Sequence, residues 1–146
     1  PFVTYSEFAN ILMSENEEAI ESMMKSAIES GQIVLHFQSI VDHNEQPIYY
    51  EALLRLVYHQ TLQSPKLFLK IAKERHFYDT LFESIANKVA EFSVQTGLRL
   101  ALNLTAEDLL DANHVDYLKN CFSGKNIILE VYCEKDSPIE VLKKSC

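Results

Sequence analysis

The sequence has 146 residues, of which 47% are hydrophobic and 23% charged, so it is long enough for one globular domain with a sizeable core. The net charge is −8 without a Lys/Arg cluster, which argues against DNA or RNA as a partner but allows a small phosphate ligand held by one arginine and a metal. No apolar run of about 18 residues could span a membrane, no secretory signal opens the chain, and three scattered cysteines fit neither disulfides nor zinc, so a cytoplasmic domain is expected.

The first predicted elements are a helix and a β-hairpin. Residues 15–30 are typical of a helix, with Ser14 opening a capping box and Gly31 at the expected end. Strands are predicted over 32–42 and 48–58. The short segment between them is rich in turn-forming residues, which indicates a hairpin.

Helices and strands alternate after the hairpin. Pro65 is expected as the first residue of a helix, and residues 79–96 carry an apolar stripe of helical period. A strand over 98–104, a helix capped by Thr105 and a strand over 126–132 follow. Long crossovers between strands imply parallel pairing under a cover of helices.

The faces of the predicted strands suggest a barrel. Each of the later strands has one apolar face and one mixed face, and sites of (β/α) barrels lie at the C-terminal ends of the strands. Those ends carry Glu51, Asn103 and Glu130. We therefore predict an α/β fold: a partial TIM-like barrel of mainly parallel strands with an opening antiparallel hairpin, truncated after about four strands.

Two carboxylates and an amide oxygen form a hard ligand set that suits Mg²⁺, Mn²⁺ or Ca²⁺. Along the second strand, Glu51, Leu53 and Arg55 share a face, which places a candidate phosphate clamp beside an acid. Metal-assisted hydrolysis of a phosphodiester is the resulting hypothesis. Structural alternatives stay open: Glu51 and Arg55 fit an ion pair, Asn103 a cap or turn, and Glu130 a solvated strand end.

Four stretches carry a family resemblance. They are "IVLHFQSIVD", "YYEALLRL", "ALNLTAEDL" and "IILEVYCE". In this order they resemble the EAL domain, the family of cyclic-di-GMP phosphodiesterases. Glu51 stands at the glutamate of the Glu-Ala-Leu motif, and Asn103 and Glu130 stand at metal-ligand positions. Gln38 stands at a substrate-contacting glutamine, whereas the next residue, Ser39, replaces the usual proline.

The resemblance implies a TIM-like barrel that hydrolyses cyclic di-GMP to linear pGpG with Mg²⁺ or Mn²⁺, two ions being expected in the complete domain. It implies that Glu51, Asn103 and Glu130 ligate metal, with Glu51 as the catalytic residue. The residues implied to contact the nucleotide are Gln38, Leu53 and Arg55.

Two departures from the family pattern bear on activity. Cys133 stands where the family has a second glutamate, which supports a loop with further metal ligands. The segment after it does not match the later family motifs, so the 146 residues alone are expected to be inactive. The alternative is a degenerate EAL domain that acts as a cyclic-di-GMP receptor or a protein-interaction module.

The expected organisation has two parts. Residues 1–14 are interpreted as the tail of a preceding domain or a linker, and residues 15–146 as the N-terminal part of an EAL domain. In the full-length protein a GGDEF or sensor domain, or a membrane anchor, would precede them. A half barrel leaves strand edges open, so a homodimer or strand-exchanged oligomer is expected.

Overall fold

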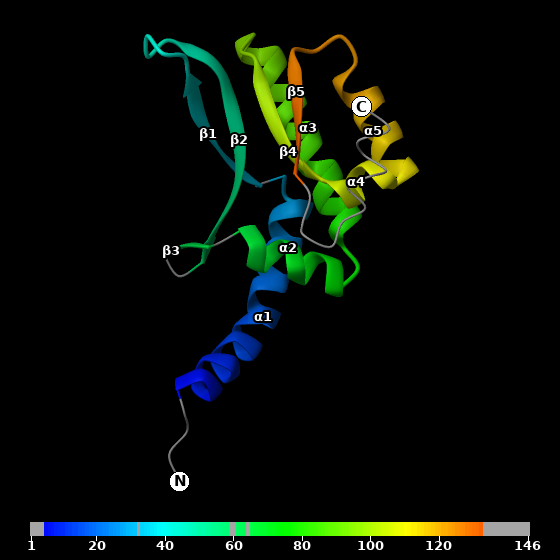
Figure 1. Ribbon diagram of the computed structural model, residues 1–146. Coiled ribbons are helices and arrows are strands. Elements are labelled where there is room, and N and C mark those ends of the chain that lie inside the picture. The colour runs from blue at the N-terminus through cyan, green and yellow to red at the C-terminus, as the bar shows by residue number, and fades with distance from the viewer. Residues whose placement is uncertain (1–4, 32, 59–60, 64, 133–146) are drawn as a thin grey trace. The chain divides into compact units, whose positions relative to one another are not determined.

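The computed structural model describes residues 5–31, 33–58, 61–63 and 65–132 (Figure 1). The chain divides into two compact units. The first lies within residues 1–34 and 55–81, and the second within residues 35–54 and 82–146. Strand β2 (Pro47–Tyr58) and helix α3 (Tyr78–Thr96) each contribute residues to both units.

In the first unit, helix α1 (Tyr5–Glu29) packs on helix α2 (Pro65–Glu74). Their contact buries Ile20 and Met24 of α1 together with Phe68 and Ile71 of α2, each at most 2% exposed. Helix α2 begins at Pro65 as predicted, because proline fits the first helical position. The short strand β3 (Thr61–Gln63), which was not predicted, pairs antiparallel with the end of β2.

Helix α1 is longer than predicted. It begins at Tyr5 rather than near Ser14, because neither glycine nor proline interrupts the chain between Tyr5 and Glu29. The serine that was interpreted as a cap therefore lies inside the helix. The predicted end is confirmed: Gly31 has φ of +70°, the left-handed conformation that commonly closes a helix.

The second unit is built on a sheet of β1 (Val34–Val41), β2, β4 (Leu100–Thr105) and β5 (Ile127–Tyr132), in the order β1-β2-β4-β5. Neighbours β2 and β4, and β4 and β5, are parallel. Strands β1 and β2 form the predicted antiparallel hairpin. The α/β prediction, with mainly parallel strands after an opening hairpin, is confirmed.

The hairpin turn is organised by Asp42. One carboxylate oxygen, Oδ1, accepts hydrogen bonds from the backbone N–H groups of Asn44 and Gln46, at 2.8 and 3.0 Å. The backbone of Asp42 also donates to Gln46 O at 2.9 Å and accepts from Glu45 N at 3.0 Å. These four bonds fix where β1 ends and β2 begins.

Helices cover one face of β4 (Figure 1). Leu100, Leu102 and Leu104 are at most 6% exposed on that face. Helix α5 (Ala112–Phe122) packs on α3, where the hydroxyl of Tyr117 donates to Asn87 Oδ1 at 2.7 Å. The corresponding face of β5 is less covered than predicted, because β5 is the last strand of the sheet among the described residues: Leu129 is 40% exposed.

The helix predicted after Thr105 is two helices. Helix α4 (Ala106–Leu110) ends at Asp111, which also caps the start of α5. The extended backbone of Asp111, with φ of −89° and ψ of 112°, separates them. Among the helices that the structure describes, none has the length and apolar character needed to cross a membrane.

Candidate functional site

Three parallel strands bring the predicted metal ligands to one face. The register places Glu51 of β2 beside Ala101 of β4, and Asn103 of β4 beside Glu130 of β5. Alternate residues of a strand share a face, so Tyr49 lies on the same face as Glu51. We call Tyr49, Glu51, Asn103 and Glu130 the acidic cluster.

Hydrogen bonds link the acidic cluster in two pairs. The Asn103 amide Nδ2 donates to Glu51 Oε1 at 2.6 Å. The phenol of Tyr49 donates to Glu130 Oε1 at 2.8 Å. All four side chains are half-buried. The carboxylates are therefore held by neighbours of the same cluster and stay within reach of solvent.

The charges of the cluster converge on the phenol. The hydrogen bond to Glu130 raises the pKa of Tyr49, and partial desolvation and then the negative charges of Glu130 and Glu51 raise it further. The nearby Arg99 acts in the opposite direction. Both carboxylates thus lie within electrostatic range of one oxygen, so negative charge is concentrated on this face of the sheet.

The remaining predicted site residues lie on β1 and β2. Leu53 is half-buried on the face of Glu51. The ring of Phe37 in β1 stacks on Phe92 of α3 with a centroid separation of 4.1 Å. The next residue, Gln38, is exposed and therefore lies on the opposite face of β1. Arg55 of β2 is half-buried and belongs to the first unit, whereas the acidic cluster belongs to the second.

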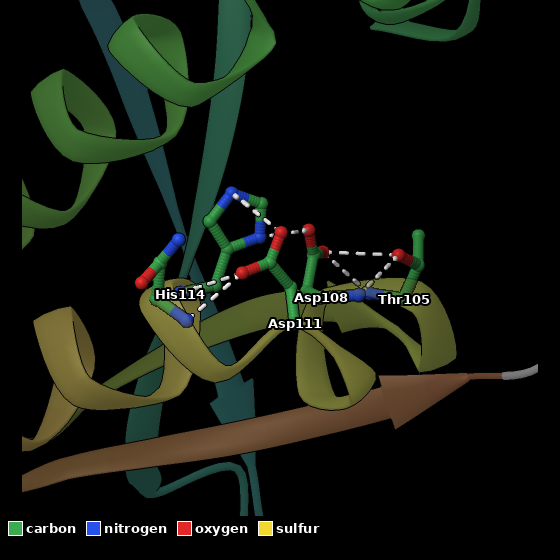
Figure 2. Close-up of polar contacts among 5 residues, drawn as sticks. Thr105, Asp108, Asp111 and His114 are labelled. Atoms are coloured by element: carbon green, nitrogen blue, oxygen red, sulfur yellow. Dashed lines mark hydrogen bonds and ion pairs between the residues drawn. The ribbon is translucent and has the colours of Figure 1, made fainter.

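A network of polar side chains fixes the chain directly after the Asn103 strand (Figure 2). Thr105 caps α4 as predicted: its hydroxyl oxygen accepts from Asp108 N at 3.3 Å, and Asp108 Oδ2 accepts from Thr105 N at 2.9 Å. Asp108 Oδ1 lies 3.4 Å from His114 Nδ1, and the imidazole stacks on Phe82 at 4.1 Å. Asp111 Oδ1 accepts from His114 N at 3.2 Å.

Sequence reasoning missed two residues of this region. Tyr49 was predicted only as a residue of the strand over 48–58, although its spacing of two from Glu51 places it on the same face. Asp108 was not singled out, although its spacing of three from Thr105 is that of a capping box. Cys133, at the position of the second family glutamate, lies outside the described residues.

The sequence matches the family described as EAL domain over residues 21–143. The chain belongs to the EAL domain family. No functionally curated protein is similar enough in sequence to match this EAL domain.

Solved structures share the fold. One described as the PaMucR phosphodiesterase in complex with c-di-GMP has a TM-score of 0.63 and 26% identity, over 77% of this chain and 51% of that one. The FimX EAL domain of Xanthomonas citri in complex with c-di-GMP has a TM-score of 0.67 and 17% identity, over 90% and 55%. An EAL domain protein of Listeria monocytogenes has a TM-score of 0.65 and 18% identity, over 85% and 53%.

This EAL domain sequence spans about half the length of the structures it matches. Their likeness identifies its strands and helices as part of a TIM-barrel-like EAL fold, which confirms the predicted fold class.

Proposed function

We propose that the acidic cluster is part of the divalent-metal site of a cyclic-di-GMP phosphodiesterase. The observation that carries the proposal is the convergence of Glu51, Asn103 and Glu130 from three parallel strands, with Asn103 bonded to Glu51 at 2.6 Å. An isolated structural glutamate on a strand requires only one partner. Here two carboxylates and an amide meet on one side of three neighbouring strands. Asn103 and Glu130 lie toward the C-terminal ends of their strands, where α/β barrels carry their chemistry, whereas Glu51 lies earlier in β2 than predicted.

The chemistry of the cluster fits Mg²⁺ or Mn²⁺. Carboxylate and amide oxygens are the ligands that hard divalent cations prefer. The Asn103 amide donates through Nδ2, which leaves its oxygen as a ligand. We therefore assign metal ligation to Glu51, Asn103 and Glu130. A metal bound there would neutralise phosphate charge and lower the pKa of a bound water for attack on the phosphodiester.

The protein's own residues bind and orient the nucleotide. Gln38 offers an amide to the nucleotide, Leu53 an apolar surface, and Arg55 a planar cation that matches two phosphate oxygens. Glu51 is assigned as the catalytic residue, because its carboxylate would hold the divalent metal that supplies an activated water for the reaction. The reaction is the opening of one phosphodiester of cyclic di-GMP to give linear pGpG.

Membership of the EAL family and the ligands of similar structures support this assignment. The PaMucR phosphodiesterase and the FimX EAL domains of Xanthomonas citri and Pseudomonas aeruginosa are all described in complex with c-di-GMP. We expect the 146 residues on their own to bind this nucleotide but not to turn it over, because three ligands are fewer than two metal ions require.

The test compares the native chain with Glu51→Ala and with Glu83→Ala, a matched removal of an exposed glutamate on α3. Binding of cyclic di-GMP is measured by calorimetry with Ca²⁺ present, and hydrolysis by chromatography with Mn²⁺. We expect binding that Glu51→Ala weakens at least about tenfold and Glu83→Ala leaves unchanged. Equal binding by Glu51→Ala and the native chain would contradict the proposed site.

Hydrolysis separates the remaining possibilities. If pGpG forms and Glu51→Ala abolishes it, the phosphodiesterase assignment holds and the expected inactivity of the 146 residues is wrong. If the longest natural form of the protein binds the nucleotide without forming pGpG, the domain is a receptor. Sedimentation of the same samples tests the predicted homodimer or strand-exchanged oligomer, and the sequence upstream tests the predicted GGDEF or sensor domain.

A further inference from the structure

The Tyr49 phenol joins two strands that are not neighbours. Its oxygen lies 2.8 Å from Glu130 Oε1, although β4 lies between β2 and β5 in the sheet. The side chain of Tyr49 must therefore cross β4 on the face that carries the acidic cluster. A tyrosine that only filled space in a strand would require no polar partner at that distance.

The register explains how the ring can cross. Tyr50 is paired with Leu100, so Tyr49 is level with Arg99, whereas Glu130 is level with Asn103. Ala101 lies between these two levels on the same face of β4 and is 0% exposed. Its small side chain leaves room for an aromatic ring that a larger residue would block.

The hydrogen bond selects one oxygen of Glu130. A glutamate side chain has three rotatable bonds, and ordering it at the moment of metal binding is unfavourable. The phenol holds Oε1 in advance and leaves Oε2 as the oxygen available to a cation. The Asn103 amide does the same for Glu51, since it also occupies one carboxylate oxygen.

We propose that Tyr49 is a positioning residue of the metal site, which holds Glu130 through Oε1 so that Oε2 is presented to the divalent cation. The inference rests on the proposed function, because it assumes that Glu130 ligates metal. Groups that orient metal ligands in this way typically raise metal affinity about 10- to 100-fold.

The experiment measures Mn²⁺ affinity of the full 146-residue chain from the EPR signal of free Mn²⁺. The variant Tyr49→Phe removes only the hydroxyl and keeps the ring. The variant Tyr117→Phe is the matched control, since it removes a hydroxyl that also makes a short hydrogen bond, at 2.7 Å to Asn87 on α3. We expect Tyr49→Phe to weaken Mn²⁺ binding about tenfold and Tyr117→Phe to leave it within about twofold.

A double-mutant cycle separates positioning from general structure. If Tyr49 acts through Glu130, Tyr49→Phe has no further effect in the Glu130→Ala background. If Tyr49→Phe lowers Mn²⁺ affinity equally in the native and the Glu130→Ala backgrounds, the inference is overturned. It is also overturned if Tyr49→Phe binds Mn²⁺ like the native chain while Glu51→Ala does not. Mn²⁺ binding that is absent, or that Glu51→Ala leaves unchanged, would overturn the proposed function and this inference with it.

Discussion

Asp108 is the residue whose loss should most weaken the chain around the acidic cluster. Its side chain is 3% exposed and meets three groups: Thr105 N at 2.9 Å, Thr105 Oγ1 at 3.0 Å and His114 Nδ1 at 3.4 Å. Thr105 is the last residue of β4, which carries Asn103. The network therefore fixes the strand end that presents a proposed metal ligand.

The expected loss of stability in Asp108→Ala follows from these contacts. Alanine keeps the backbone N–H of residue 108 that bonds to the Thr105 hydroxyl, so this half of the cap survives, but losing the carboxylate beside His114 Nδ1 costs about 1 kcal/mol. Leaving the half-buried Thr105 N–H and its hydroxyl without their acceptor adds about 2 kcal/mol. The total of about 3 kcal/mol corresponds to a fall in Tm of roughly 9 °C, at about 3 °C per kcal/mol for a chain of this size.

Urea unfolding followed by circular dichroism measures this loss in the free energy of unfolding, and is repeated at several protein concentrations. Asp108→Asn keeps an oxygen acceptor and the shape of the side chain, so we expect it to lose only about 1 kcal/mol. Asp116→Ala, which removes an exposed aspartate from α5, is the control and should stay within about 0.5 kcal/mol of the native chain. A loss below about 1 kcal/mol in Asp108→Ala, or one equal to that of Asp116→Ala, would show that Asp108 does not hold the end of β4.

Three further measurements probe other parts of the chain. His76→Gly should stabilise the chain by about 0.5 kcal/mol in the same unfolding assay, because His76 has φ of +61° between α2 and α3; a loss of stability would contradict this. Leu118 is 4% exposed, so Leu118→Ala should cost about 3 kcal/mol of stability. Leu110 is 52% exposed, so Leu110→Ala should cost less than about 0.5 kcal/mol. Similar losses in the two variants would be inconsistent with the packing of α5. Burial raises the pKa of the Cys121 thiol, so less of it is the reactive thiolate. Its alkylation by iodoacetamide at about pH 8, followed by peptide mass spectrometry, should therefore be slower than that of glutathione. An equal rate would argue against burial of the thiol.

The strands and their polar ends could be predicted because they depend on local patterns. A period of two in β4 and β5 identifies the face that carries Asn103 and Glu130, and parallel pairing then places these residues side by side. The start of α1 could not be predicted in this way. A capping-box spacing at Ser14 is a local preference that a helix without breakers overrides.

The hydrogen bonds of the site could not be predicted from local patterns. Tyr49 and Glu130 are separated by 81 positions in the sequence, and the small Ala101 that lies between them belongs to a third strand. No period within β2 distinguishes a tyrosine that bonds a distant carboxylate from one that only packs. The break at Asp111 was missed for a related reason, because one aspartate serves both as the end of α4 and as the cap of α5.

Strand β2 is paired on both sides, so its register is specified twice. The Asp42 turn fixes it against β1, and parallel pairing with Leu100 and its neighbours fixes it against β4. Removing one residue between Asp42 and Glu51 would set these registers in conflict, because a strand shifted by one position turns every side chain to the opposite face. Natural variation of this segment is therefore expected to consist of substitutions, with length changes confined to other loops of the domain.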